Sequence, residues 1–281
     1  MEPVDLRSML GAYAVGAFPM ADSRDAHELF WVEPKLRAVF PLDSFSPARS
    51  LAKAVRQDRF RVTADTEFDA VVAACGERAD DRDDTWINPQ LEDAYARLHA
   101  MGRAHSVECR DAVGTLVGGL FGVTLGRAFF GESMFSRSRD ASKVALVHLV
   151  ARLRLGGFTL LDCQFMTDHL ASLGAVAVPQ AVYREALLYP AVSGVVSRAG
   201  VALGAGRGAA GALSSGERGA AVVGDWGALD RWLAAGAPFA DGVALVPPAD
   251  AASATPPVAS SCPATSTSPG HSIAQLFTKT S

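Results

Sequence analysis

The chain has 281 residues, of which 49% are hydrophobic, and a formal net charge of −4. This length provides for one large or two small domains with a proper core. The net charge gives no global sign of nucleic-acid binding, so any nucleic-acid site must be a local basic patch. The sequence contains no run of 18 apolar residues, so we predict no membrane span. The N-terminus lacks the basic and apolar regions of a signal peptide.

The four cysteines give no sign of a metal site or of a disulfide framework. Cys75, Cys109, Cys163 and Cys262 have no CxxC spacing and no nearby paired histidines. Such isolated cysteines suit a reducing compartment. We therefore expect a cytoplasmic protein that binds no metal.

Residues 5–102 predict helices that alternate with short strands. Asp5 can cap a helix, and prolines stand in the first turn after Ser46 and after Asn88. The expected helices span residues 5–16, 46–57, 68–75 and 88–101. The expected strands span residues 18–20, 29–32, 37–40 and 60–64.

The next segment, residues 105–188, predicts an antiparallel meander followed by further helices and strands. The meander strands are expected at 105–109, 115–123 and 128–130, with short turns at 111–114 and 124–126. We expect Ser142 to cap the following helix, which ends at Gly156. The remaining expected elements are a buried strand at 159–163, a helix at 168–173, a strand at 175–178 and a helix at 180–188.

The composition changes after Pro190. Residues 200–221 are mostly Gly, Ala and Ser, and residues 247–270 are mostly Pro, Ser, Thr and Ala. Such segments bury too little apolar area to offset the entropy of ordering, so we expect 195–222 and 248–270 to be flexible. Two apolar islands are expected to dock on the core, as a helix at 225–235 and as a strand at 272–278.

Residues 127–136 place one carboxylate, Glu132, among four aromatic or methionine side chains. The stretch predicts a strand that runs into a tight turn at Gly131. A carboxylate in apolar surroundings is costly unless a cation or a hydrogen-bond donor meets it. Two interpretations stay open: a turn carboxylate bonded to nearby backbone amides, or a pocket that holds an apolar side chain beside a cationic group.

A second polar group ends the buried strand, where Asp162 and Gln164 flank Cys163. The two-residue period of a strand points Asp162 and Gln164 to one side and Cys163 to the other. The pair could orient a substrate or handle a proton, although a neutral amide is a poor base by itself, or it could be purely structural. We expect Cys163 to be an inert core cysteine.

One helix face carries a basic stripe. Arg49, Lys53 and Arg56 recur at helical spacing, with Arg59 nearby, while Leu51 lies on another face. A stripe of this kind usually marks a solvated helix face, and it can also contact phosphates.

Many short motifs follow one another in a fixed order. They are Tyr13…Gly16-x-Phe18-Pro19-Met20, Trp31-x-x-Pro34, Thr85-Trp86-Ile87, Tyr95-x-x-Leu98-His99, Gly118-Gly119-x-x-Gly122, Phe130-Gly131-Glu132-Ser133-Met134-Phe135-Ser136, Ala141-Ser142-Lys143, Asp162-Cys163-Gln164 and His169-x-Ala171-Ser172-Leu173-Gly174. This order resembles the leucyl/phenylalanyl-tRNA–protein transferase family over about residues 10–188. Members of that family move Leu or Phe from charged tRNA onto proteins whose first residue is Arg or Lys, and the product is a degradation signal.

The resemblance implies an α/β (α+β) fold with two domains. A small N-terminal domain would span 1–38, and an acetyltransferase-like (GNAT-like) catalytic domain with a mostly antiparallel central sheet would span 39–190. The composition after Pro190 adds a low-complexity extension over 191–281. The implied partners are Leu-tRNA or Phe-tRNA and protein or peptide acceptors with N-terminal Arg or Lys, with no cofactor and no membrane.

The resemblance also implies roles for single residues. Glu132 would pair with the cationic first residue of the acceptor, and Gln164, oriented by Asp162, would hold the incoming α-amine against the ester carbonyl. These three residues form the implied catalytic set. The implied substrate-binding set is Leu120, Phe129, Met134, Ser136, Leu161, Trp86, Trp31 and Tyr95.

The tRNA contacts follow from the same resemblance. Trp86 is the better candidate to stack on the terminal adenosine, and Trp31 is the weaker one because Val32 stands where some members have a second tryptophan. Arg49, Lys53 and Arg56 would contact phosphates of the acceptor stem. Thr167 replaces an asparagine of the family pattern and receives no role.

Two alternatives remain. A coenzyme A-dependent acetyltransferase of the same fold would need a pyrophosphate-binding loop before a helix, and the nearest candidate, residues 154–159, leads into a strand. A non-catalytic tRNA-binding protein would not need Glu132 and Gln164.

Overall fold

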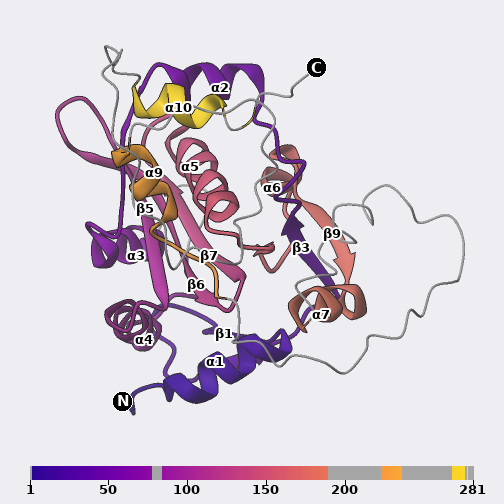
Figure 1. Cartoon of the computed structure of the whole chain (residues 1–281). Coiled ribbons are helices and arrows are strands. Elements are labelled where there is room, and N and C mark those ends of the chain that lie inside the picture. Colours follow the sequence, from indigo (N-terminus) through magenta and orange to yellow (C-terminus); the bar gives the residue numbers. More distant parts are fainter. Residues whose placement is uncertain (1, 78–83, 189–222, 236–267, 276, 278–281) are drawn as a thin grey trace, which may run out of the picture.

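The computed structural model describes residues 2–77, 84–188, 223–235, 268–275 and 277. These residues build a mixed α/β structure with one large sheet and a separate pair of strands (Figure 1). Within the described residues, no helix is long and apolar enough to cross a membrane.

The large sheet has seven strands in the order β4-β5-β6-β7-β8-β3-β9. Their bounds are β3 Leu36–Phe40, β4 Arg61–Ala64, β5 Ala104–Arg110, β6 Leu116–Leu125, β7 Ala128–Ser136, β8 Leu160–Asp162 and β9 Val176–Pro179. Every neighbouring pair is antiparallel except β7 and β8, which run parallel. The expected meander and the mostly antiparallel sheet are confirmed.

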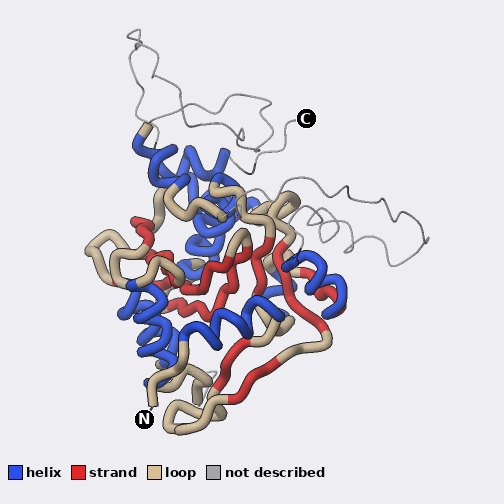
Figure 2. Tube along the Cα trace, turned by 60° about the horizontal axis from the view of Figure 1, so that its bottom comes forward, coloured by secondary structure: helices blue, strands red, loops and turns tan. Residues whose placement is uncertain are grey.

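Helices cover both faces of this sheet, which lies between them in Figure 2. Their bounds are α1 Leu6–Val15, α2 Arg49–Arg56, α3 Phe68–Gly76, α4 Pro89–Ala100, α5 Ala141–Leu155, α6 Asp168–Ser172, α7 Gln180–Leu188, α9 Ala228–Ala234 and α10 Pro269–Gln275. Successive strand residues face opposite layers. Leu120 and Phe129 belong to the core cluster with α2 and α5, whereas Phe121 and Phe130 belong to the cluster with α1, α3 and α4.

The N-terminal segment forms as its sequence predicts. The Asp5 side chain accepts hydrogen bonds from the backbone N–H groups of Arg7 and Ser8, and Gly16 ends α1 with φ +89°. That left-handed conformation favours glycine. After Gly16 the chain forms β1 (Phe18–Met20), which pairs antiparallel with β2 (Phe30–Val32). The helix and the strand pair together direct Tyr13, which is fully buried, toward the large sheet.

The expected tight turn at Gly131 is wrong, because β7 continues through it to Ser136. Gly131 pairs with Gly122 and Ser133 pairs with Phe121, so Glu132 is an extra residue without a partner on β6. This is a β-bulge, which bends a strand and redirects one side chain. A Cβ atom on Gly122 would lie 2.2 Å from the carbonyl oxygen of Phe130, so only glycine fits there.

Two helix starts also differ from expectation. Asp140, with φ +69°, precedes the first residue of α5, so Ser142 lies inside the helix and does not cap it. The backbone N–H of Ser142 instead donates to Oγ of Ser136 at 3.3 Å. The second helix begins at Arg49, two residues after Pro47, because Ala48 is still in an extended conformation.

Two C-terminal segments dock on the core. The helix expected at 225–235 is confirmed as α9, where Leu229 is buried and Asp230 accepts hydrogen bonds from Arg152. The strand expected at 272–278 is wrong: α10 is a helix with Pro269 in its first turn, and it lies beside α2 (Figure 1). Gly270 permits this packing, since a Cβ there would meet the carbonyl oxygen of Val55. Of the segments expected to be flexible, 195–222 and 248–267 lie outside the described residues.

Candidate active site

A cavity of about 300 Å³ opens between β6, β7, β8, α5 and the segment around α6. Its wall is mainly apolar, with Leu120, Met134, Leu146, Leu149 and Leu161 among the lining residues. The elements that supply this wall belong to the layer between the sheet and α5. A cavity of this size and lining can hold one hydrophobic side chain together with part of a larger substrate.

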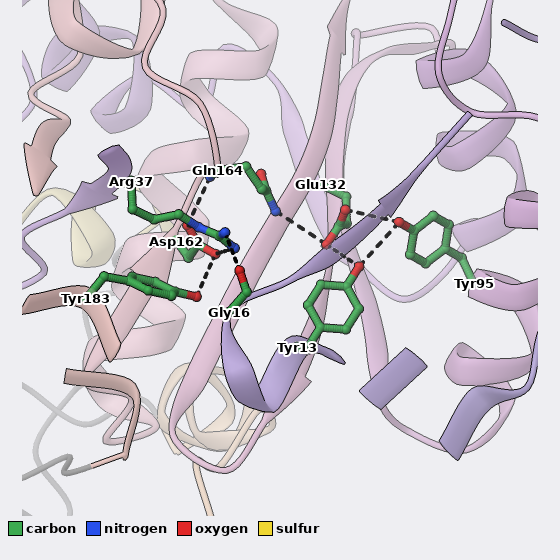
Figure 3. A network of polar contacts seen from close by, with 8 residues as sticks. All are labelled: Tyr13, Gly16, Arg37, Tyr95, Glu132, Asp162, Gln164 and Tyr183. Atoms are coloured by element: carbon green, nitrogen blue, oxygen red, sulfur yellow. Dashed lines mark hydrogen bonds and ion pairs between the residues drawn. The ribbon is translucent and has the colours of Figure 1, made fainter. Parts of the chain in front are cut away.

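Glu132 is the only carboxylate among the described residues that line the cavity. The bulge directs it toward three donors. Oε1 accepts hydrogen bonds from Tyr13 Oη at 2.7 Å and from Gln164 Nε2 at 3.4 Å, and Oε2 accepts one from Tyr95 Oη at 3.0 Å (Figure 3). Burial, which leaves Glu132 only 9% exposed, raises its pKa to about 7 even though the two tyrosine hydrogen bonds oppose that shift.

The two tyrosines come from different helices. Tyr13 lies on α1 and Tyr95 on α4, and both are fully buried. Burial first, and the nearby charge of Glu132 second, raise the pKa of each phenol well above its ordinary value. Both hydroxyl groups therefore remain protonated and act as donors to the carboxylate.

Asp162 lies in a separate, fully buried ion pair. Its carboxylate accepts from Arg37 Nε at 2.9 Å and from Arg37 Nη2 at 2.7 Å, and Tyr183 Oη donates to it at 3.1 Å. Arg37 also donates to the carbonyl oxygen of Gly16 at 2.6 Å, which ties the end of α1 to the sheet. The side chains of Arg37 and Asp162 are 1% and 0% exposed, so this pair is closed to solvent.

The structure joins Asp162 to Gln164 through the backbone and not through the amide side chain. Asp162 accepts a hydrogen bond from the backbone N–H of Gln164 at 2.9 Å, while the amide side chain lines the cavity. Gln164 follows β8 with φ +56°, and this left-handed residue interrupts the alternation of the strand. Asp162 therefore fixes the backbone that presents the amide.

Cys163 packs against the core cluster, as expected. It is also partly exposed and lines the cavity next to Gln164. Burial raises the pKa of its thiol well above the ordinary value, and the nearby carboxylates add to that shift. A protonated thiol is a weak nucleophile, so Cys163 serves as part of the wall.

Comparison with known proteins identifies the family. The family model described as leucyl/phenylalanyl-tRNA protein transferase matches residues 39–188, which is more than half of the chain. The chain belongs to this family. The model for the N-terminal domain of the leucyl/phenylalanyl-tRNA protein transferases matches residues 4–35 as well. The resemblance inferred from the order of the motifs is thus confirmed.

Relatives with the name leucyl/phenylalanyl-tRNA–protein transferase are similar over most of their length. The protein of Rhizorhabdus wittichii is 60% identical over 204 residues, which cover 73% of this chain and 81% of the relative. That of Zymomonas mobilis is 57% identical over 184 residues, covering 66% and 68%. That of Cereibacter sphaeroides is 58% identical over 181 residues, covering 64% and 82%.

Half of the substrate-binding residues that the transferase family implies lie together in the structure. Leu120, Met134, Leu161 and Trp86 line the cavity with Glu132 and Gln164. The Trp86 ring meets Tyr95 edge-on, with 6.5 Å between the ring centroids. The lining therefore combines an apolar wall with one aromatic face.

Four other residues of the implied set are not part of the cavity lining. Phe129 is fully buried and stacks on Trp226 at 5.6 Å, and Tyr95 is buried behind Glu132. Ser136 is exposed and donates to the carbonyl oxygen of Ser138. Trp31 lies on β2 and is 46% exposed. Tyr95 thus contacts the site through Glu132, whereas Phe129, Ser136 and Trp31 have no contact with the cavity.

The basic stripe lies on the outer face of α2. Arg49, Lys53 and Arg56 are exposed, while Leu51 and Val55 are buried on the inner face. The stripe thus presents its charges to solvent. Its separation from the cavity wall is consistent with a contact to a different part of a large substrate.

Sequence reasoning missed three residues of the site: Tyr13, Arg37 and Tyr183. Tyr13 begins the ordered motifs but has no role in the implied set, and Tyr183 lies in the expected helix at 180–188. The one local signal was a charged residue, Arg37, inside an otherwise apolar strand. A buried charge of that kind requires a partner. Groups of His, Cys, Asp or Glu that could hold a metal are absent from the described residues.

Proposed function

We propose that the chain transfers Leu or Phe from aminoacyl-tRNA to the N-terminal Arg or Lys of acceptor proteins. The reaction forms a peptide bond and creates a degradation signal. Membership of the transferase family supports this activity, as do the names of relatives at 57–60% identity.

The observation that carries the proposal is the apolar cavity with two polar groups on one side. The side chains of Leu and Phe gain about 1.5–3 kcal/mol when they are removed from water into such a wall. Glu132 then meets the positive charge of the acceptor, and Gln164 seats the amine against the ester carbonyl. Because the ester is already activated, positioning supplies much of the rate.

The tRNA contacts extend beyond the cavity. Trp86 stacks on the terminal adenosine, because its ring lines the cavity and remains partly exposed. The acceptor-stem phosphates are contacted by Arg49, Lys53 and Arg56. Each contact releases counterions from the tRNA, which favours binding. Trp31 is the second candidate for a base, since its ring is exposed on β2.

The proposal includes the architecture and the compartment. A small N-terminal domain over 1–38 precedes an acetyltransferase-like domain over 39–190, and 191–281 form the extension. Free cysteines and a substrate of charged tRNA fit a cytoplasmic enzyme. The cavity residues supply binding and orientation for the reaction, and the proposed transfer needs no cofactor.

A transfer assay tests the function. The purified full chain is incubated with Leu-tRNA or Phe-tRNA and with peptides that begin with Arg, Lys, Ala or Glu, without ATP or coenzyme A. We expect transfer to the Arg and Lys peptides only. Glu132→Ala and Gln164→Ala should remove most of the transfer while tRNA binding persists.

Two outcomes would contradict the proposal. Acetylation that requires coenzyme A would indicate an acetyltransferase. Tight tRNA binding with no transfer to any peptide would indicate a non-catalytic tRNA-binding protein.

A further inference from the structure

Two buried carboxylates flank Gln164, and they differ in whether they can still accept a proton or a further hydrogen bond. Asp162 contacts the backbone N–H of Gln164, and Glu132 contacts its side-chain amide. Figure 3 shows the two carboxylates on opposite sides of Gln164, each within its own group of hydrogen-bond donors. An amine held by Gln164 therefore has two carboxylates nearby. Their hydrogen bonds decide which of the two can take a proton from it.

Asp162 has no place left for a proton. A carboxylate offers about four lone-pair positions. Oδ1 accepts from Arg37 Nε and from the backbone N–H of Gln164, and Oδ2 accepts from Arg37 Nη2 and from Tyr183 Oη. Its side chain is 0% exposed. Protonation would leave the buried Arg37 charge without its partner, which is costly.

Glu132, which lines the cavity, keeps a free hydrogen-bonding position. Oε1 accepts from Tyr13 at 2.7 Å and from Gln164 at 3.4 Å, while Oε2 accepts only from Tyr95 at 3.0 Å. One lone pair of Oε2 is therefore available, and the long contact to Gln164 can be exchanged for a stronger donor. Glu132 can therefore accept two N–H donors, one from the acceptor's side chain and one more, without losing either tyrosine.

The side-chain amide of Gln164 indicates which substrate group would reach the free position on Glu132. Nε2 of Gln164 lies 3.4 Å from Oε1 of Glu132, so a nitrogen held by that amide lies beside the same carboxylate. If Gln164 seats the attacking amine, as in the proposed function, the donor nearest to Glu132 is the α-ammonium group itself. We infer that Glu132, and not Asp162, takes the proton that the α-ammonium must lose before it can attack.

The charges around Glu132 fit this role. Tyr13 from α1 and Tyr95 from α4 donate to it, Gln164 is neutral, and the Arg37 and Asp162 charges on β3 and β8 oppose each other in their effect on it. Burial raises the pKa of Glu132 to about 7, close to the value of about 7.7–8.0 for an α-amino group. A base with a pKa near that of the group it deprotonates is efficient near neutral pH.

The α-ammonium gives one proton to the carboxylate of Glu132 and becomes a neutral amine. The amine lone pair forms a bond to the ester carbonyl carbon, and the carbon–oxygen bond to the tRNA ribose breaks. The second proton of the nitrogen goes to the leaving ribose oxygen, which becomes a hydroxyl, and Glu132 later releases its proton to solvent. The products are a peptide bond, a free ribose hydroxyl and one proton.

Glu132→Gln separates this role from the pairing of Glu132 with the acceptor's side chain. The value of kcat/KM is measured between pH 6.5 and 8.5 under single-turnover conditions, with a peptide that begins with Arg and with one that begins with the neutral analogue citrulline. For the wild type, a base near pH 7 and an ammonium near pH 8 give a bell-shaped profile that changes only about threefold over this range.

The variant must use amines that are already neutral in solution. We expect its transfer to the Arg peptide at pH 6.5 to fall about 100-fold, and then to rise about 20-fold by pH 8.5 as the amine deprotonates on its own. The citrulline peptide lacks the positive charge, so the wild type should use it more slowly, but the variant should show the same pH-dependent defect with it. The matched control is Glu108→Gln, which alters another fully buried carboxylate on β5, outside the cavity. It should keep the wild-type profile.

Three outcomes would overturn the inference. A defect with the Arg peptide that is constant with pH and absent with the citrulline peptide would assign Glu132 to side-chain recognition alone. A wild-type profile in the variant would exclude the base. Loss of the acidic limb in Asp162→Asn, with near-ultraviolet circular dichroism unchanged, would give the role to Asp162. Absence of transfer in the wild type would instead contradict the proposed function, so the two failures are distinguishable.

Discussion

Tyr13 Oη lies 2.7 Å from Glu132 Oε1, although 119 positions separate the two residues in the sequence. The contact joins α1 to the bulge of β7. Because the raised pKa of Tyr13 keeps its hydroxyl protonated, Tyr13 always donates to the carboxylate. The N-terminal helix therefore takes part in setting the ionisation of the acid that lines the cavity.

Tyr13→Phe should raise the pKa of Glu132 further. The substitution removes one of the two tyrosine donors, and a lost donor to the charged form disfavours that form. The acidic limb of the transfer rate should move to higher pH, and activity at pH 6.5 should fall more than activity at pH 8. A pH series of kcat/KM measures this, with Tyr183→Phe, which removes a donor to Asp162, as the comparison. An acidic limb at the wild-type position would contradict the coupling.

Glu132→Gln should stabilise the fold at alkaline pH. The pKa of Glu132 is about 7 in the folded protein and about 4.3 in an unfolded chain, so the folded state binds the proton more tightly. The stability from this group is fully present below about pH 4 and is lost as pH rises through about 7. The variant should therefore exceed the wild type in free energy of unfolding by up to about 4 kcal/mol at pH 8 and by about 1 kcal/mol at pH 5. Urea unfolding at the two pH values measures this, and an equal difference at both would contradict the raised pKa.

Removal of only one charge of the Arg37–Asp162 pair should lower the free energy of unfolding strongly. Arg37→Met leaves a carboxylate buried without its cation, which costs about 3–5 kcal/mol. The double variant Arg37→Met with Asp162→Leu removes both charges and should recover at least half of that loss. Urea unfolding of the two single variants and the double variant forms the cycle. A double variant as unstable as the sum of the singles would show that the two charges act independently.

Local signals in the sequence predicted most elements of the fold. Asp5 and the Asn88-Pro89 pair mark helix starts that the structure confirms, since the caps act within one turn of the chain. The short turns at 111–114 and 124–126 indicated the antiparallel meander for the same reason. Where the determinant is local, the sequence was sufficient.

The differences arise where the determinant is distant. The bulge at Glu132 depends on the register between β6 and β7, and the Arg37–Asp162 pair joins residues 125 positions apart. The helical form of α10 depends on its contact with α2, where Gly270 meets the backbone of Val55. Of the candidate site, the residue types at Glu132 and Gln164 were recognisable, but the donors that tune Glu132 were not.

A larger side chain at Met134 should discriminate between the two amino acids. Met134 is partly buried and lines the cavity, so Met134→Trp can extend into it without overfilling the core. We expect transfer of Phe to fall at least about tenfold more than transfer of Leu, because Phe is the larger side chain and even one methylene group in an apolar pocket changes rates by roughly 10–200-fold. Parallel assays with Phe-tRNA and Leu-tRNA give the ratio, with Met101→Trp, an exposed methionine outside the cavity, as the control. An equal loss for both amino acids would indicate that Met134 does not bound the pocket.

The basic stripe on α2 should govern the salt dependence of tRNA binding. Arg49, Lys53 and Arg56 are exposed, and each phosphate contact contributes about 0.7–0.9 to the slope of log affinity against log salt. The triple variant to Gln should lower that slope by about 2–3 and weaken tRNA binding at low salt, while the maximal transfer rate at saturating tRNA stays within about threefold. Arg7→Gln combined with Lys35→Gln changes exposed cations outside α2 and serves as the control. Because Leu51 and Val55 hold the inner face of α2 against the core, the triple variant should fold normally. An unchanged slope would show that the stripe is only a solvated helix face.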